Sequence, residues 1–245
     1  MSHHLTLKNA PIQEGLIDLR TLFDAPPTGR AFEAISNELR ATYPESSPLQ
    51  QLTAHFQVGD AGHSQGATTQ HRGMLLQSAD KTFVFQAQVD GFTVSRLRPY
   101  TTWDDLLSEA KKLWLVFEKH TQPVTVNRVA VRYINCFELP EPIQNLSDFL
   151  QAPPDLPASL PQHLSNYLTR YQLPDPDTGA TISLTQSMDD TGNNRKQFTI
   201  DIDAFKNAEF EAYRHEWWQL LDQLRHLKNR VFFASLTERT LDRFR

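Results

Sequence analysis

The sequence predicts an α+β fold in which a curved, mainly antiparallel sheet carries amphipathic helices on one face. Three observations favour this class. Strand-like stretches outnumber helical ones, short turns with Gly, Asn and Asp join several of them as in hairpins, and the helical segments place their apolar residues along one stripe. The 245 residues are 39% hydrophobic, enough for a substantial core, and no stretch approaches the roughly 18 uninterrupted apolar residues of a membrane-spanning helix.

The first half of the chain begins with a long strand over residues 12–23, where apolar and polar residues alternate. Thr28 is expected to cap a helix that ends before Pro44. The next four strands are expected at residues 49–58, 70–77, 82–89 and 91–98. Residues 59–70 are expected to form a mobile loop between the first two of these, and an amphipathic helix begins near Thr102.

The second half begins with a β-branched segment, residues 124–138, which is the strongest strand in the sequence. Residues 139–176 hold 8 of the 15 prolines and are expected to form a surface excursion with short helices at 146–150 and 160–170. Two further strands are expected at residues 180–188 and 196–204. A long helix is expected from about residue 207, and a short C-terminal helix from residue 235.

Both halves follow the same order of long strand, helix, antiparallel strands and long helix, which divides the chain into residues 10–120 and 123–245. The order allows a duplicated unit, although the halves share no clear sequence identity. We expect one domain over residues 1–245, with the proline-rich excursion packed on it. A parallel α/β fold is the alternative, and the short hairpin-like turns disfavour it.

Charge and cysteine content narrow the function classes. The chain has 24 Lys+Arg against 29 Asp+Glu, a net charge of −5, which disfavours nucleic acid as a partner even though residues 225–245 are locally basic. The single cysteine, Cys136, excludes an intramolecular disulfide and a zinc site built on cysteine pairs. Because the first 15 residues also lack an apolar signal core, we expect a cytoplasmic protein without membrane association.

The candidate ligand-binding residues are arginines on strands. Arg128 and Arg132 are four residues apart and so project from one face, about 13 Å apart at 3.3 Å per residue. Arg96 lies on an earlier strand, and arginine binds carboxylate or phosphate through two parallel hydrogen bonds. The predicted site for an anionic ligand therefore contains these three arginines, and Glu14 joins them if the first strand is adjacent.

Tyr133 and Asn135 complete this predicted site at the end of the same strand. They point to the face opposite the arginines in a regular strand, so all the residues share one site only if the strand twists or bulges. The alternative is that the arginines form cross-strand ion pairs on a solvated face. The carboxylates available for those pairs are Glu14, Asp18, Asp201 and Asp203.

The sequence contains no nucleophile elbow, no glycine-rich phosphate loop and no two-histidine zinc motif. We therefore predict no catalytic residue, no metal ligand and no cofactor. Asp201 and Asp203 keep an alternative open, because two carboxylates on one strand face could bind Mg²⁺. The protein would then be an enzyme acting on a phosphorylated or nucleotide substrate through a divalent metal.

Four segments together resemble a sporadically distributed bacterial protein family of unknown function: NAPIQEGLIDLR, GFTVSRLRPYTTWDDLLSEAKKLWLVFEKH, VNRVAVRYINCFELP and VFFASLTERTLDRF. The resemblance covers essentially the whole chain and implies an intracellular protein that is one unit, with no catalytic residue to transfer. It marks Glu14, Arg96, Pro99, Tyr100, Trp103, Arg128, Arg132, Tyr133 and Asn135 as pattern residues. The patchy distribution of such a family is that of accessory genes, including defence genes.

These observations favour a non-enzymatic binding module that engages an anionic small molecule or a protein partner. A third class is a homodimer formed through the last helices and Trp218, which is expected to be exposed beside a buried Trp217.

Overall fold

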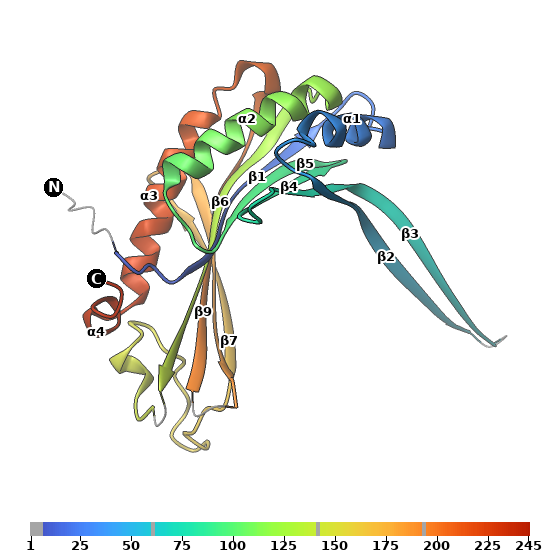
Figure 1. Ribbon diagram of the computed structural model, residues 1–245. Helices are drawn as coiled ribbons and strands as arrows, with labels where there is room; N and C mark the ends of the chain where they lie inside the picture. The colour runs from blue at the N-terminus through green and yellow to red at the C-terminus, as the bar shows by residue number, and fades with distance from the viewer. Residues whose placement is uncertain (1–6, 60–61, 141–142, 193–194) are drawn as a thin grey trace.

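The computed structural model describes residues 7–59, 62–140, 143–192 and 195–245, with the backbone alone for 52–59, 62–68 and 140. Its strands form one sheet of nine strands in the order β2-β3-β4-β5-β1-β6-β9-β8-β7, and every neighbouring pair is antiparallel. Together with four α-helices, this confirms the α+β class (Figure 1).

The first half contains β1 (Ile12–Leu22), α1 (Gly29–Leu39), β2 (Glu45–Gly59), β3 (Gly62–Gln77), β4 (Phe83–Gln88), β5 (Gly91–Leu97) and α2 (Trp103–Thr121). The second half contains β6 (Thr125–Pro140), β7 (Tyr167–Asp175), β8 (Ala180–Asp190), β9 (Arg195–Glu211), α3 (Trp218–Ser235) and α4 (Glu238–Leu241), with 3₁₀ turns at Leu146–Asp148 and Ala212–Arg214.

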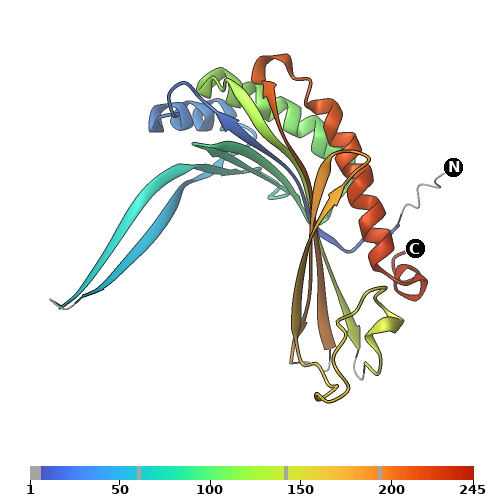
Figure 2. The same ribbon diagram turned by 180° about the vertical axis from the view of Figure 1, so that it is seen from behind.

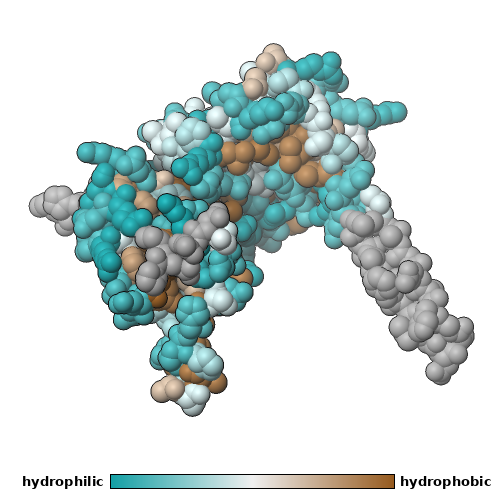
Figure 3. All heavy atoms as spheres, turned by 60° about the horizontal axis from the view of Figure 1, so that its bottom comes forward, coloured by the Kyte–Doolittle hydropathy of each residue, from teal (hydrophilic) through white to brown (hydrophobic). Residues whose placement is uncertain are grey.

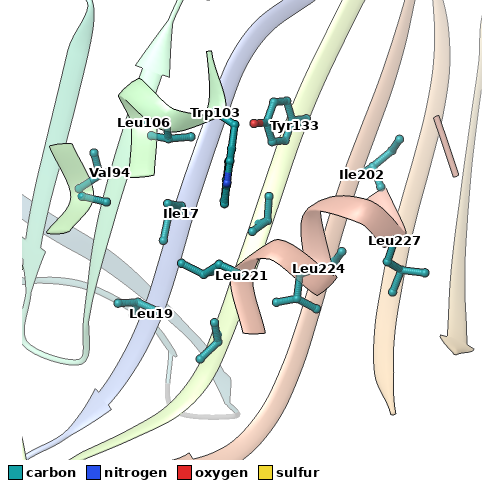
Figure 4. Close-up of a cluster of buried hydrophobic side chains, with 14 of the residues drawn as sticks. Ile17, Leu19, Val94, Trp103, Leu106, Tyr133, Ile202, Leu221, Leu224 and Leu227 are labelled. Atoms are coloured by element: carbon teal, nitrogen blue, oxygen red, sulfur yellow. The ribbon is translucent and has the colours of Figure 1, made fainter. Parts of the chain in front are cut away.

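The helices lie on one face of the sheet, as the two opposite views show (Figures 1 and 2). The core fills the space between them, with Ile17 and Leu19 of β1 facing Leu221 and Leu224 of α3 (Figure 4). We call this side the helix-covered face and the other the open face. Because successive strand residues alternate between the two faces, the register assigns every strand side chain to one of them.

The long amphipathic helix is confirmed as α2. The Thr102 hydroxyl accepts a hydrogen bond from the Asp105 backbone N–H, and Gln122 ends the helix in a left-handed conformation. On the buried stripe, the Trp114 ring lies 5.4 Å from Phe92 of β5 and 4.8 Å from Trp217, measured between ring centres. Because Trp217 belongs to the second half of the chain, these aromatic contacts join the two halves on the helix-covered face.

The loop predicted over residues 59–70 is wrong for Gly59 and residues 62–70, because β2 and β3 pair up to Gly59 and Gly62, with one register shift between Leu49 and Gln50. Residues 60 and 61 of that prediction lie outside the described residues. Figure 1 shows this hairpin extending away from the rest of the sheet. The glycine, serine and threonine content suggested a loop, but the backbone hydrogen bonds between two long antiparallel strands do not depend on side-chain type.

Two predictions in the second half are also wrong. The helix predicted over residues 160–170 is absent: residues 160–166 are irregular, and β7 begins at Tyr167. β7 is an edge strand, and Pro174 is tolerated in it because one side of the strand has no partner. The last long helix begins at Trp218, not near 207, because β9 stays paired with β6 as far as Glu211. Trp218 is half-buried against the core and is not the exposed tryptophan that the sequence suggested.

The described part of the proline-rich segment packs against the end of α3 and the residues that follow it. The backbone N–H of Gln151 donates to the Ser235 carbonyl at the end of α3, and that of Thr237 donates to the Phe149 carbonyl. In the part of the chain that the structure describes, no helix is long and apolar enough to cross a membrane.

Candidate anion-binding pocket

Arg128 and Arg132 project from the same face of the sheet, as predicted, and the structure shows that it is the open face. Carboxylates hold both arginines. Arg128 donates to Asp18 at 2.6 Å and to Asp203 at 2.7 Å, and its guanidinium lies 4.6 Å from the centre of the Phe205 ring. Arg132 donates two hydrogen bonds to Asp201, at 2.8 and 2.5 Å. The structure therefore shows the cross-strand ion pairs of the alternative interpretation.

Asp18 is the centre of this open-face network. Its side chain is 10% exposed and accepts hydrogen bonds from Arg20 at 3.1 Å, Thr93 at 2.8 Å and Arg128. Burial raises the pKa of Asp203 despite the nearby Arg128 cation.

When the bottom of the molecule in Figure 1 is turned forward, its surface is mainly hydrophilic, with a band of hydrophobic side chains near the centre (Figure 3).

The other predicted site residues are divided between the two faces. Glu14 lies on the open face. The pKa of Arg132 is raised mainly by its hydrogen bonds with Asp201, and the charge of Glu14 adds to this rise. Arg96 lies on the helix-covered face, where it donates to the Thr82 hydroxyl and lies 4.6 Å from the centre of the Phe83 ring. The three arginines therefore do not share one site.

Tyr133 and Asn135 belong to a different feature, a pocket of about 500 Å³ on the helix-covered side. Its walls come from the segment before β1, the corner between β5 and α2, the β6 residues Tyr133 and Asn135, and the second half of α3. The pocket thus lies where the two halves of the chain meet, and its volume is that of a small-molecule site.

The charge of this pocket is one-sided. Lys8, Arg98, Arg225 and Lys228 line it, and no Asp or Glu is among its lining residues. Arg98 and Lys8 are exposed at the rim. Arg225 lies 5.5 Å from the centre of the Trp103 ring and forms an ion pair with Asp222 at 3.7 Å. Asp222 accepts a hydrogen bond from the Trp103 indole at 2.9 Å. In a chain with a net charge of −5, four cations that line one cavity create a local positive potential, which the ion pair of Arg225 with Asp222 reduces in part.

Lys228 is the most unusual of these cations. It is 7% exposed, and its Nζ lies 3.5 Å from the centre of the Tyr133 ring. Within the described residues its ammonium group has no hydrogen-bond acceptor and no carboxylate partner. Burial, and secondarily the charge of Arg225, lowers the pKa of Lys228 to about 7.

Two tyrosines form the polar wall beside Lys228. The hydroxyls of Tyr100 and Tyr133 are 2.5 Å apart, and burial raises the pKa of both side chains. Gly15 makes room for the pair, since a Cβ at this position would lie 2.8 Å from the Tyr100 ring and 2.9 Å from the Tyr133 ring. Asn135 is held by hydrogen bonds from its amide nitrogen to the Ile200 carbonyl and, at 3.4 Å, to the Tyr133 carbonyl.

A larger hollow of about 850 Å³ lies under the proline-rich segment, but its cation Lys196 donates to Asp190 at 2.9 Å. Among the residues that the structure describes, no group of three or more His, Cys, Asp and Glu side chains is arranged to hold a metal ion. The smaller pocket is therefore the better candidate site.

The sequence interpretation found Tyr133 and Asn135 but missed Arg225 and Lys228. The signal was present, because Lys228 follows Leu221 and Leu224 at helical spacing on the predicted apolar stripe of the last helix. A lysine on a buried stripe requires either a partner or a function.

No protein-family model matches the chain, and no curated protein matches its sequence.

Proposed function

We propose that this protein is a non-enzymatic binding module that holds a small anionic molecule in the pocket between α3 and the β5–α2 corner. One observation carries the proposal: Lys8, Arg98, Arg225 and Lys228 line the cavity without a single carboxylate. A carboxylate or phosphate group would supply the partner that Lys228 lacks.

The pocket also has the surfaces that a ligand's uncharged part requires. Trp103, Tyr133 and Phe232 line it, so an apolar or planar group can pack against aromatic rings while the anion contacts the guanidinium and ammonium groups. A charge-assisted hydrogen bond to arginine contributes roughly 1.5–3 kcal/mol, which is sufficient to orient such a ligand.

The strand order supports the proposal that the two halves of the chain are copies of one unit. In that arrangement the pocket lies where the two halves meet. In the first half, β5 pairs with β1 and leads into α2; in the second, β9 pairs with β6 and leads into α3. β1 and β6 are neighbours at the centre, so the two halves continue outward in opposite directions as a curved sheet. The same observations support a single domain, because each half contributes walls to one cavity.

The resemblance to a bacterial family fits this site. Pro99, Tyr100, Trp103, Tyr133 and Asn135, five of the residues that carry the resemblance, line the pocket. In the proposed role, the protein is a cytoplasmic accessory or defence-associated factor that responds to an anionic metabolite. The open face, with its paired arginines, remains available for a protein partner.

Isothermal titration calorimetry with inorganic phosphate and with citrate tests the proposal. We expect Arg225→Gln to weaken binding about tenfold, the equivalent of about 1.4 kcal/mol. Arg230→Gln is the matched control, because Arg230 is on the same helix but does not line the pocket. Equal binding by both variants, or no binding above that of chloride at the same ionic strength, would contradict the proposal.

A further inference from the structure

The environment of Lys228 differs from that of the other buried lysine, Lys196. Lys196 is 4% exposed, but its ammonium group donates to Asp190 and to the Ser165 carbonyl. Among the described residues, the ammonium group of Lys228 contacts the face of the Tyr133 ring, and Arg225 lies nearby with the same sign of charge. The two buried lysines therefore differ in that Lys196 has hydrogen-bond acceptors and Lys228 adjoins a cavity.

An amine without an acceptor in a cavity is a nucleophile when it is neutral. Desolvation beside another cation is the arrangement that activates lysine for attack on carbonyl carbon. The pKa of about 7 that burial gives Lys228 makes a large fraction of the amine neutral near pH 7.5. The pocket adjoining it has space for a reacting molecule.

We infer that Lys228 forms a Schiff base with a carbonyl compound that carries an anionic group, such as a small 2-oxo acid or a phosphorylated aldehyde. The inference rests on the proposed function, because Arg225 and Arg98 bind the anionic group and so bring the carbonyl carbon to the amine. It names the chemical class of the ligand and makes the binding covalent and reversible.

The chemistry balances without an oxidant or a reductant. Nζ attacks the carbonyl carbon, and the electron pair of the C=O π bond moves to the oxygen. The two protons of the amine leave with that oxygen as water, and the C=N bond forms. The hydroxyl pair of Tyr100 and Tyr133 offers an uncharged O–H group in the pocket wall that can pass a proton to the departing oxygen.

Reductive trapping with glyoxylate tests the inference on the full chain. The protein is incubated with glyoxylate and sodium cyanoborohydride at pH 7.5, and peptide mass spectrometry locates carboxymethyl groups on lysine. We expect Lys228 to be modified at least tenfold faster than the exposed Lys112 on α2. Lys228→Met should lose the fast modification, and Lys112→Met should retain it.

Glycolate, which has the same carboxylate and no carbonyl, separates the two proposals. If glycolate and glyoxylate both raise the melting temperature and Lys228 is not modified faster than Lys112, the Schiff base is refuted and the binding proposal stands. Fast modification of Lys8 in place of Lys228 also refutes it. If neither acid raises the melting temperature and no fast modification occurs, both proposals fail.

Discussion

The Nζ of Lys228 lies 3.5 Å from the centre of the Tyr133 ring, and this contact joins a residue of α3 to the central strand β6. A cation over an aromatic face gains a favourable electrostatic interaction, but less than a carboxylate partner would provide. The stability of the protein and the anion binding that we propose for it are therefore coupled at this one side chain.

Lys228→Met should stabilise the protein while weakening anion binding. Methionine has a similar length and no charge to desolvate, and replacing buried charges by apolar residues is often neutral or stabilising by about 1–4 kcal/mol. Urea denaturation at pH 7 measures the change, and titration with phosphate measures the affinity. A loss of more than about 1 kcal/mol would show that the ammonium group is held by an interaction that the structure lacks.

The stability difference between wild type and Lys228→Met should shrink as the pH rises. The folded-state pKa of about 7 lies below the ordinary lysine value of about 10.5, so between these values the unfolded chain binds more protons and wild-type stability increases with pH. The free-energy cost of burying the charged Lys228 amine is at its full value below pH 7 and disappears towards pH 10.5. At a slope that approaches 1.4 kcal/mol per pH unit, the difference should fall by about 2.5 kcal/mol between pH 7.5 and 9.5.

Comparing the two proteins at each pH cancels the titration of groups that both contain. The ionisable groups that line the pocket with Lys228 are Arg225 on its own helix, Tyr133 on β6, Tyr100 and Arg98 at the β5–α2 corner, and Lys8. A difference that stays constant with pH would mean that the amine titrates equally in the folded and unfolded states.

Gly15→Ala should disturb the tyrosine pair. The added Cβ would lie within 3 Å of both rings, so Tyr100 or Tyr133 must move, and overpacking of this kind costs about 1–3 kcal/mol. Gly29→Ala is the matched control because a Cβ there has no atom within 4 Å, and we expect it to be neutral or slightly stabilising. Thermal denaturation and phosphate titration of both variants check the prediction. Equal stability of the two variants would contradict it.

The open-face ion pairs should differ in their contribution to stability. Asp18 is buried among three donors, and Asp18→Ala leaves Arg128 with one of its two carboxylates, so we expect a loss of about 3 kcal/mol. The side chain of Arg132 is 42% exposed, so Arg132→Ala should lower the free energy of unfolding by less than about 1 kcal/mol. Urea denaturation of the two variants gives both values.

Arg132→Ala also distinguishes the pocket from the arginine site that the sequence suggested. Because Arg132 lies on the open face and does not line the pocket, phosphate affinity should remain within about twofold of the wild type, less than 0.5 kcal/mol. A tenfold loss of phosphate affinity would show that the anion binds at the arginines of the open face.

The sequence by itself determined the α+β class, the central strands, the α2 helix with its start near Thr102, and the shared face of Arg128 and Arg132. All of these depend on local periodicity and capping, which neighbouring residues specify. The extent of β3, β7 and β9 required the tertiary structure, since strand length depends on a partner that is distant in sequence.

The candidate site depended even more on the tertiary structure. Tyr133 and Asn135 were visible as strand-end residues, but Lys228 and Arg225 lie some 90 residues later in the sequence. Only the packing of α3 against β6 brings that lysine over the Tyr133 ring and leaves its nitrogen without an acceptor. The absence of a carboxylate is a property of the assembled cavity, because the solvation and partners of a charge are set by what surrounds it in space.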